Sequence, residues 1–437
     1  MYKKSRFNIE LLKEKEYVVL FNTFSKEYIK INSDPIKYEN IFSDAVDTEI
    51  PAELINGHFI VDSNCNEDLL CDVLYYRETI ADTSLWYTII PTRNCNFNCF
   101  YCCQPHVKQT MSDETIDLIA KSLRKNLKNY SSFILSFFGG EPLIEYDKVI
   151  KILDDSMGIC KKLSRNFTAY MTTNGYTLSL DVFKELLKRH VIYYHITLDG
   201  PPSIHDTHRP LASGEPSFQT IIDNLISIKE NVKSNTFHIT LRTNITKSIY
   251  ENIDEFVEIL AKNFSNDSRF NIYWRWVEDF GGDRINEHMD ELVTMDKVFK
   301  AMDKLHNAGL SLYNDVIYTA KKGALVCEAS KQNYYVIDYD STLLKCTHWD
   351  KPEVATIGRI GSNGDLILDR EREAFYTQKV PKDKCRKCYF EPLCHGKSCS
   401  IRNIINPNGC YKIREFFRHS LMLAAESRIG TISEVNL

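Results

Sequence analysis

Six strand-like runs alternate with five helix-like segments in the middle of this chain, and this alternation constrains the fold more than any other feature of the sequence. The strand-like runs are 85–90, 133–138, 167–172, 193–198, 238–242 and 271–277. The helix-like segments are 113–127, 146–163, 180–188, 217–231 and 249–263. Such alternation implies a parallel sheet covered by helices. Because six strands are too few to close an eight-stranded barrel, we expect an α/β fold with an open, partial (β/α)6 barrel that binds its ligands at the carboxyl ends of the strands.

The segments on either side of this barrel differ from it in their strand and helix patterns and in their cysteine content. Residues 1–85 show a β-hairpin pattern between 17 and 31 and then a helical pattern, which indicates a small N-terminal α+β domain. The barrel is expected over 86–290, followed by a bridging segment over 291–319. Within 320–437, seven cysteines lie among short strand-like runs such as 334–337 and 342–344, which indicates a loop-rich domain held together by metal.

Composition excludes several classes of protein. Of the 437 residues, 43% are hydrophobic and 26% are charged, as in a soluble globular protein. The net charge of −5 leaves no excess of cations to neutralise phosphates, so no nucleic-acid partner is expected. No apolar stretch resembles a membrane span or the core of a signal peptide, so we expect a cytoplasmic protein without a membrane partner. In that compartment the 14 cysteines stay reduced, and those at short spacings are expected to bind metal.

The first cysteine cluster directly follows the first strand of the barrel. It has the pattern Cys95-x₃-Cys99-x₂-Cys102, and three thiolates on one loop can bind three corners of an iron–sulfur cube while leaving the fourth iron open. A zinc site is the alternative, but it would need a fourth ligand, for which His106 is the obvious candidate. The position at a strand end, where parallel sheets hold their active sites, favours the cube.

Polar motifs that contain glycine follow three further strands. They are Gly139-Gly140-Glu141-Pro142, Thr172-Thr173-Asn174-Gly175 and Thr197-Leu198-Asp199-Gly200, and His205-Asp206-Thr207-His208-Arg209 follows soon after the last. Paired glycines allow close backbone approach to a ligand, and a carboxylate beside them can receive an ammonium group. Because the carboxyl ends of parallel strands meet at one edge, these motifs indicate one shared ligand.

With these motifs, residues 86 to about 280 resemble a radical S-adenosylmethionine (SAM) enzyme, whose signature is C-x₃-C-x₂-C followed by Gly-Gly-Glu-Pro. The resemblance implies an enzyme in which Cys95, Cys99 and Cys102 hold a [4Fe–4S] cluster whose open iron binds SAM. One electron then splits SAM into methionine and a 5′-deoxyadenosyl radical, which removes a hydrogen atom from the substrate. The implied SAM contacts are Gly139, Gly140 and Glu141 at the methionyl amino group, Tyr101 by the adenine, Asn174 near the ribose, and Thr197 and Arg209 near the carboxylate.

The seven cysteines near the end of the chain resemble the SPASM domain, which holds two auxiliary [4Fe–4S] clusters. The resemblance implies one complete set of ligands, Cys385, Cys388, Cys394 and Cys410, and one set of three, Cys327, Cys346 and Cys399. An open iron follows as a hypothesis from the missing eighth cysteine, and a pair of zinc sites is the alternative. The chain departs from the usual pattern at Ser341, where a glycine is usual, and in the spacing between Cys394 and Cys399, which is one residue longer than usual.

The three parts together resemble maturases of ribosomally made peptides. In such enzymes a recognition domain, here residues 1–85, binds the leader of a precursor peptide, often as a strand added to a sheet edge. The resemblance implies this peptide and a reductant such as flavodoxin or ferredoxin as partners. The implied reaction is an intramolecular cross-link, which is a thioether, a carbon–carbon or a carbon–oxygen bond.

Two other functions are weighed against this one. Anaerobic sulfatase-maturating enzymes oxidise Cys or Ser to formylglycine and carry an aspartate, the proposed base, directly after the second SPASM cysteine. This chain has Thr347 at that position, and a neutral hydroxyl cannot take up a proton near pH 7 as a carboxylate can. A non-catalytic iron–sulfur electron carrier does not account for the SAM-type motifs at four strand ends.

Overall fold

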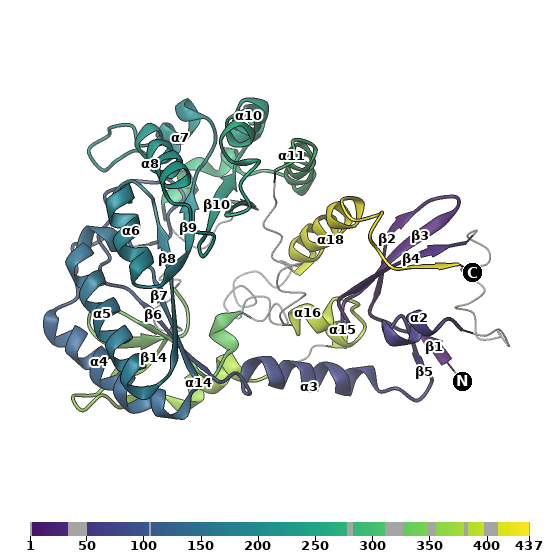
Figure 1. Cartoon of the computed structure of the whole chain (residues 1–437), viewed down its shortest axis with the longest axis horizontal. Helices are drawn as coiled ribbons and strands as arrows, with labels where there is room; N and C mark the ends of the chain where they lie inside the picture. Colours follow the sequence, from purple (N-terminus) through teal and green to yellow (C-terminus); the bar gives the residue numbers. More distant parts are fainter. Residues whose placement is uncertain are drawn as a thin grey trace. The chain divides into compact units, whose positions relative to one another are not determined.

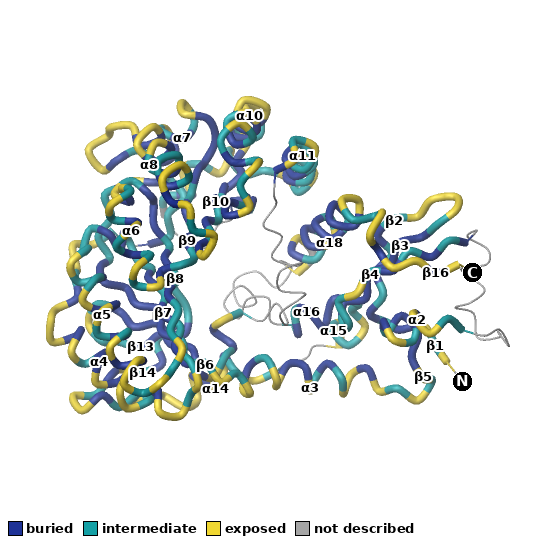
Figure 2. The backbone as a smooth tube through the Cα atoms, viewed as in Figure 1, coloured by how far each residue is buried: buried dark blue, intermediate teal, exposed yellow. Residues whose placement is uncertain are grey.

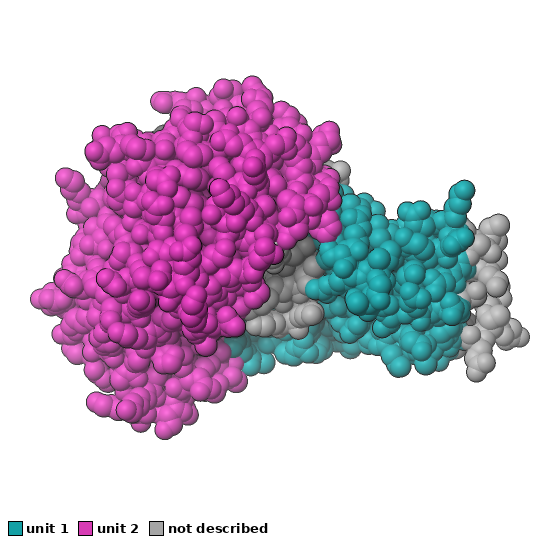
Figure 3. Space-filling view, turned by 45° about the horizontal axis from the view of Figure 1, so that its top comes forward, with its two compact units in different colours: residues 1–82, 314–332, 377–437 teal, residues 83–313, 333–376 magenta. Residues whose placement is uncertain are grey.

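The computed structural model of the chain describes two compact units. The described residues are 2–33, 50–104, 106–277, 283–310, 327–347, 355–379, 383–396 and 410–436. The smaller unit comprises residues 1–82, 314–332 and 377–437, and the larger comprises 83–313 and 333–376 (Figure 3). This grouping differs from the four consecutive segments expected from the sequence, because 333–376 group with the barrel and the N-terminal segment groups with 377–437.

Six parallel strands form the centre of the larger unit, as predicted. They pair in sequence order and are β6 (Ser84–Ile89), β7 (Ser132–Phe137), β8 (Asn166–Thr173), β9 (Val191–Thr197), β10 (His238–Ile245) and β11 (Phe270–Trp276). Helices between the strands cover one face of the sheet (Figure 1). The longer ones are α4 (Asp113–Asn126), α5 (Tyr146–Leu163), α6 (Leu180–Lys188), α8 (Phe218–Asn231) and α10 (Ile253–Phe264). Shorter ones are η1 (Leu127–Asn129), η2 (Pro142–Glu145), α7 (Pro202–His208) and α9 (Lys247–Glu251).

Alternating burial explains why the runs of apolar residues form strands here. In β7, Phe133, Leu135 and Phe137 are at most 1% exposed, whereas Ile134 and Ser136 point to the opposite face and are partly exposed. Figure 2 shows the same contrast between buried strands and the exposed outer sides of the covering helices. Among the described residues, none of the helices is long and apolar enough to span a bilayer.

The barrel sheet continues into residues that the sequence analysis assigns to another domain. Strand β12 (Tyr334–Ile337) pairs in parallel with β6, and antiparallel strands β13 (Thr342–Leu344), β14 (Thr356–Ile360) and β15 (Leu366–Leu368) follow. Helix α14 (Arg370–Thr377) comes next. The join is apolar, because Ile90 packs with Tyr334, Val336 and Leu344 in one buried cluster. The expected single domain over 320–437 is therefore divided.

The described part of the expected bridging segment, which ends at residue 310, groups with the barrel. Helix α11 (Met295–Asn307) follows the short helical segment η3 (Asp283–Glu291) and packs against α10 and β11. Its buried side chains are Val298, Ala301, Met302 and Leu305, which recur at helical spacing.

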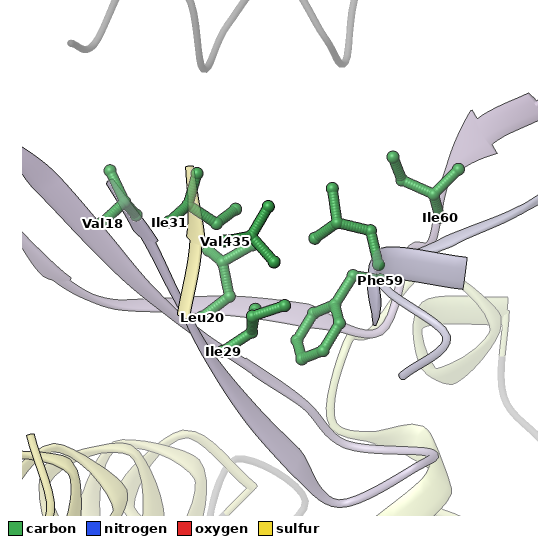
Figure 4. Packing of buried hydrophobic residues seen from close by; sticks show 8 residues of the cluster. Val18, Leu20, Ile29, Ile31, Phe59, Ile60 and Val435 are labelled. Atoms are coloured by element: carbon green, nitrogen blue, oxygen red, sulfur yellow. The ribbon is translucent and has the colours of Figure 1, made fainter. Parts of the chain in front are cut away.

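The smaller unit contains the predicted hairpin. Strands β2 (Asn8–Lys13), β3 (Tyr17–Asn22) and β4 (Glu27–Asn32) form an antiparallel sheet, and β16 (Glu434–Asn436) adds to β4 in parallel. A separate pair joins β1 (Tyr2–Lys4) and β5 (Ile60–Asp62). The helices are α2 (Ala52–Asn56), α3 (Glu67–Thr79), η4 (Glu328–Ser330), α15 (Asp383–Arg386), α16 (Glu391–Cys394) and α18 (Cys410–Glu426). The core of the sheet contains Val18, Leu20, Ile29, Ile31 and Val435, packed with Leu54, Phe59 and Ile60 (Figure 4).

The assignment of residues 333–376 to the barrel predicts a specific stability effect. Leu344 on β13 is 1% exposed, so Leu344→Ala leaves a cavity and is expected to lower the free energy of unfolding by about 2–5 kcal/mol. Ile367 on β15 is 50% exposed, and Ile367→Ala is the matched control, with an expected change within about 0.5 kcal/mol. Urea unfolding of the metal-free chain measures both, and equal effects of the two substitutions would contradict the packing described.

Candidate active site

The three cysteines of the first cluster lie together on the loop that follows β6. Cys99 is 7% exposed, and Cys95 and Cys102 are partly exposed. Burial raises the pKa of Cys95 to about 12, with a smaller contribution from the neighbouring thiols of Cys99 and Cys102. Burial also raises the pKa of Cys99 to about 11. Thiolates in such surroundings need a positive partner, which the irons of a cluster supply.

His106, the fourth ligand considered for zinc, lies beside the cysteine loop. Its Nε2 atom is 3.3 Å from Sγ of Cys102, within hydrogen-bond distance. Among the described residues, no three His, Cys, Asp or Glu side chains lie close enough together to hold one metal ion. Three thiolates on one loop can bind three corners of a four-iron cube, and this ligand set stays a prediction.

A backbone ribbon joins the cysteine loop to the segment that carries Arg209. Asn98 N donates to Pro210 O at 2.9 Å, and Phe97 and Leu211 form an antiparallel bridge. Two further bonds of the ribbon are Phe100 N to His208 O at 3.3 Å and Ala212 N to Asn96 O at 2.7 Å. The cysteines and Arg209, which lie more than a hundred residues apart in the sequence, are therefore held on one pair of segments.

Two glycines at the end of β7 let the chain approach the other side of the loop. Gly140 N donates to Thr92 O at 3.2 Å and Glu141 N to Asn94 O at 2.9 Å. A Cβ atom on Gly139 would lie 2.5 Å from Thr92 O, and one on Gly140 would lie 2.0 Å from Asn94 O. The φ angle of Gly139, 126°, is also one that other residues rarely adopt. These glycines therefore permit close contact with the start of the cysteine loop.

The carboxylate of Glu141 fastens the Gly-Gly-Glu-Pro turn to the end of β8. It is fully buried and accepts hydrogen bonds from Leu143 N at 3.0 Å, Thr173 Oγ1 at 2.8 Å and Asn174 N at 2.6 Å. Burial raises its pKa. The structure thus gives Glu141 a structural role that the sequence did not reveal, and its contact with the SAM amino group stays a prediction.

Asn174 links β8 to the cysteine loop. Its Nδ2 atom donates to Asn96 Oδ1 at 2.7 Å, and its Oδ1 atom accepts from Tyr176 N at 3.0 Å. The side chain is 8% exposed, and its position near a ribose stays a prediction.

Tyr101, Asp199 and Arg209 form a buried polar network behind the loop. The Tyr101 hydroxyl donates to Asp199, and Arg209 Nη1 donates to the same hydroxyl at 2.7 Å and lies 3.8 Å from Asp199 Oδ2. Burial raises the pKa of Tyr101 well above its usual range. Arg209 is 6% exposed, and its Nε atom has no hydrogen-bond partner in the described structure. Because buried donors are nearly always paired, this free N–H fits a bound carboxylate such as that of SAM.

Asp199 was part of a motif in the sequence but was not predicted as a site residue. It is fully buried, its Oδ1 accepts from Asn244 N of β10 at 2.7 Å, and its own N–H donates to His205 Nδ1 at 3.1 Å. It therefore ties the ends of β9 and β10 to Tyr101. The signal that could have identified it is an Asp-Gly pair directly after a strand. Thr197 ends β9, partly exposed and paired in register with Arg242, and its SAM contact stays a prediction.

A cavity of about 530 Å³ adjoins the cysteine loop. Its lining includes Cys99, Phe100, His208, Arg284 and Glu291. The Phe100 ring lies 4.9 Å from the His208 ring, and Arg284 donates to Cys99 O at 3.4 Å. The loop therefore has an accessible side next to one of the cysteines.

Four of the later cysteines gather in the smaller unit. The pKa of Cys394 is raised to about 12, mainly by burial and also by the nearby thiols of Cys410, Cys388 and Cys385. Cys388 N also donates to Cys385 O at 2.9 Å. These four are the cysteines predicted to bind one auxiliary cluster completely, and their proximity fits that ligand set.

The second auxiliary set is described only in part. Cys399 lies outside the described residues, and Cys327 and Cys346 belong to different units. Cys346 packs against the cluster at the join of β6 and β12, and the carbonyl of Thr347 accepts from Gln104 Nε2 at 2.7 Å. The chain after Cys346 is therefore fastened to the end of the first cysteine loop, and the three-cysteine set stays a prediction.

Comparison with known proteins relates part of this chain to one superfamily. Residues 89–262 match the radical SAM superfamily. The radical SAM cyclopropyl synthase TigE of Paramaledivibacter caminithermalis is 25% identical over 193 residues, which are 40% of this chain and 39% of TigE. The chain thus aligns with less than half of that relative.

Two solved structures share the fold over most of the chain. Native anSMEcpe with bound AdoMet superposes with a TM-score of 0.60 at 16% identity, covering 79% of this chain and 100% of that one. Streptococcus suis SuiB bound to precursor peptide SuiA gives a TM-score of 0.51 at 16% identity, covering 93% and 97%. The open barrel with additional segments on both sides is therefore a known architecture.

The close approach at Gly140 generates a prediction. In Gly140→Ala the new Cβ would collide with the Asn94 carbonyl, so the start of the cysteine loop must move. We expect a loss of stability of about 1–3 kcal/mol and at least a tenfold fall in SAM cleavage, with less iron bound per chain. Gly158→Ala in α5 is the control, because nothing lies within 4 Å of its Cβ position. Unchanged iron content and SAM cleavage in Gly140→Ala would contradict this role.

Proposed function

We propose that this chain, whose residues 89–262 match the radical SAM superfamily, is a radical SAM enzyme that matures ribosomally made peptides. In this proposal it uses a 5′-deoxyadenosyl radical to abstract hydrogen from a precursor peptide and forms an intramolecular thioether, carbon–carbon or carbon–oxygen cross-link. The observation that carries the proposal is the smaller unit, in which an N-terminal β-sheet is built onto the segment that holds four clustered cysteines.

Direct contacts join that sheet to the cysteine segment. Arg6 Nη1 donates to Cys388 O at 3.3 Å, and the Thr23 hydroxyl donates to Tyr389 O. Arg6 also pairs with the buried Glu391 at 2.7 Å. A peptide bound to the sheet would therefore be held by the same body as an auxiliary cluster, as expected of an enzyme that modifies peptides.

The residues of the larger unit have distinct proposed roles. Cys95, Cys99 and Cys102 hold the [4Fe–4S] cluster, and Arg209 receives the SAM carboxylate while Tyr101 and Asp199 hold the guanidinium in place. When bound, the cluster and SAM supply the radical that abstracts hydrogen. The two auxiliary clusters, and flavodoxin or ferredoxin as reductant, belong to the proposal as well.

The comparisons supply support for the substrate class. SuiB was crystallised with its precursor peptide SuiA, and it shares its fold with this chain over 93% of the chain's length. TigE, a cyclopropyl synthase, shares the radical SAM part. Because SuiA binding is known for SuiB and cyclopropyl synthesis for TigE, peptide binding by this chain and the bond that it forms are proposals.

One residue, Thr347, argues against the sulfatase-maturating alternative. The residue after Cys346 is Thr347, whose carbonyl accepts a hydrogen bond from Gln104 Nε2 near the first cysteine loop. Here that side chain carries a neutral hydroxyl, which does not serve as a base near neutral pH.

The assignment of Arg209 predicts a defect in SAM binding. Loss of a charge-assisted hydrogen bond lowers the binding free energy by about 1.5–3 kcal/mol. Arg209→Gln is therefore expected to raise KM for SAM roughly 10- to 100-fold, while the iron content stays unchanged. Arg189→Gln is the control, because Arg189 pairs with Asp154 and Glu185 at the surface. An unchanged KM in a folded Arg209→Gln variant would contradict the assignment.

The reaction itself is tested by mass spectrometry. The reduced, reconstituted chain is incubated with SAM and a short Cys-rich peptide encoded beside its gene, and Cys95, Cys99 and Cys102 are replaced by Ala in a control chain. We expect a product that has lost two hydrogen atoms and kept its sulfur, and no 5′-deoxyadenosine from the control, which should still bind auxiliary iron. A product that has lost the sulfur of Cys would indicate formylglycine and overturn the cross-linking proposal, and SAM cleavage by the control would overturn the cluster assignment.

A further inference from the structure

The short helical segment η3 is anchored beside the first cysteine loop at three points. Its Ile285 side chain is 3% exposed. The ring of His288 lies 4.7 Å from the ring of Phe100, which belongs to the loop. The carboxylate of Glu291 accepts hydrogen bonds from Ser248 N at 3.0 Å and from Ser248 Oγ at 2.7 Å. The position of η3 relative to the loop is therefore fixed by packing and by hydrogen bonds.

Arg284, in the first turn of η3, reaches the backbone of the cysteine loop. Its Nη1 atom donates to Asn98 Oδ1 at 2.9 Å and to Cys99 O at 3.4 Å. Burial raises the pKa of Cys99 and of Cys102, and the positive charge of Arg284 opposes that rise at both thiols. The guanidinium is therefore hydrogen-bonded to one proposed cluster ligand, and its charge acts on two of them.

The positive charge of Arg284 is not balanced by a carboxylate in the described part of the chain. Arg284 forms no ion pair there, although Glu287 and Glu291 line the same cavity of about 530 Å³. Arg209, on the other side of the loop, differs in this respect because it lies 3.8 Å from Asp199 Oδ2. Arg284 therefore presents a net positive charge to the cysteine loop.

The sign of the effect on an iron–sulfur cluster follows from the charge of the ligand set. A [4Fe–4S] cluster held by three thiolates carries one net negative charge when oxidised, and one-electron reduction adds a second. A positive charge nearby stabilises the more negative form by a larger amount. A guanidinium beside such a cluster therefore raises its reduction potential, which depends on local charge and on hydrogen bonds.

We propose that Arg284 raises the reduction potential of the cluster on the first cysteine loop and thereby favours the one-electron reduction that precedes SAM cleavage. The electron comes from the proposed reductant, flavodoxin or ferredoxin, and no bond of Arg284 is made or broken. Because Arg284 acts through the loop and not by contact with the substrate, it is a positioning residue. This inference rests on the proposed function, since it concerns the cluster of that site.

The potential is measured on the reconstituted full chain by electron paramagnetic resonance during a redox titration. The signal followed is the part that is lost when Cys95, Cys99 and Cys102 are replaced by Ala, so the auxiliary clusters do not contribute. In Arg284→Gln, we expect the ratio of reduced to oxidised cluster at a fixed potential to fall about tenfold, which is about 59 mV for a one-electron couple. The iron content is expected to stay unchanged.

Matched substitutions separate the charge of Arg284 from its packing. Arg284→Lys keeps the charge and is expected to keep the ratio within about twofold of that of the unchanged chain. Lys300→Gln in α11 is the control, because it removes one positive charge from an exposed side chain that pairs with Asp296 at 2.8 Å and is screened by solvent. An equal fall in Arg284→Lys and Arg284→Gln, or the same fall in Lys300→Gln, would overturn the proposal.

Guanidinium ions supply a second measurement on a shorter side chain. Arg284→Ala removes the guanidinium at the edge of the cavity. Guanidinium chloride, at a concentration that leaves the circular dichroism spectrum unchanged, is expected to restore the ratio, and potassium chloride at the same concentration is not. Restoration by neither salt, or by both equally, contradicts the role of the charge. A fall in iron content in both Arg284→Gln and Arg284→Ala would show a structural role and overturn the proposal as well.

Cleavage of SAM by the same preparations separates the two proposals. If the unchanged chain forms 5′-deoxyadenosine but Arg284→Gln titrates at the same potential, the Arg284 proposal fails and the radical SAM activity stands. If the potential falls in Arg284→Gln but the unchanged chain forms no 5′-deoxyadenosine, the catalytic proposal fails and the role of Arg284 stands.

Discussion

The loop that carries the first three cysteines is hydrogen-bonded through its backbone on both sides, and the rest of the site depends on this constraint. On one side, the turn after β7 donates to Thr92 and Asn94, which needs two glycines because any Cβ would collide. On the other side, the loop pairs with the segment that carries Arg209. A loop without regular secondary structure thereby gains the positional precision of a sheet. A cluster needs this precision because its three ligands must stay in a fixed arrangement while its open iron binds a ligand.

Two buried carboxylates extend the same constraint to the remaining strand ends. Glu141 joins β7 to β8, and Asp199 joins β9 to β10 and to Tyr101. Both are fully buried, and burying a carboxylate is unfavourable unless donors surround it. The donors here come from different strand ends, so they are in place only when the ends are aligned. The carboxylates therefore penalise misalignment, and Asp199 together with Tyr101 orients the guanidinium of Arg209.

Patterns that are local in sequence could be predicted, and pairings between distant segments could not. The strands at 334–337 and 342–344 were predicted at the observed residues, because apolar β-branched runs indicate strands by themselves. Strand β12 pairs with β6, which lies about 250 residues earlier. The sequence of a short run does not identify the strand with which it pairs. The three-residue strand β16 has too few residues to show a period. At the site, spacing predicts the cysteines as ligands. The burial of Glu141 and the role of Asp199 depend on donors from other strands, which residue type alone does not reveal.

In the smaller unit, the proposed peptide site and the proposed cluster site share one network of ion pairs. Glu391 is 1% exposed on α16, the helix that ends at Cys394, and it pairs with Arg6 at 2.7 Å and with Lys379 at 3.2 Å. Arg6 belongs to the N-terminal segment, so removing that segment takes one counter-charge from a buried carboxylate beside a cysteine that is proposed as a cluster ligand. It would also take residues from β6 if the cut were made after residue 85. Loss of peptide turnover after such a truncation would therefore reflect a damaged cysteine segment as much as a missing peptide site. Single substitutions in β4 leave Arg6 and Glu391 intact, and they separate the two causes.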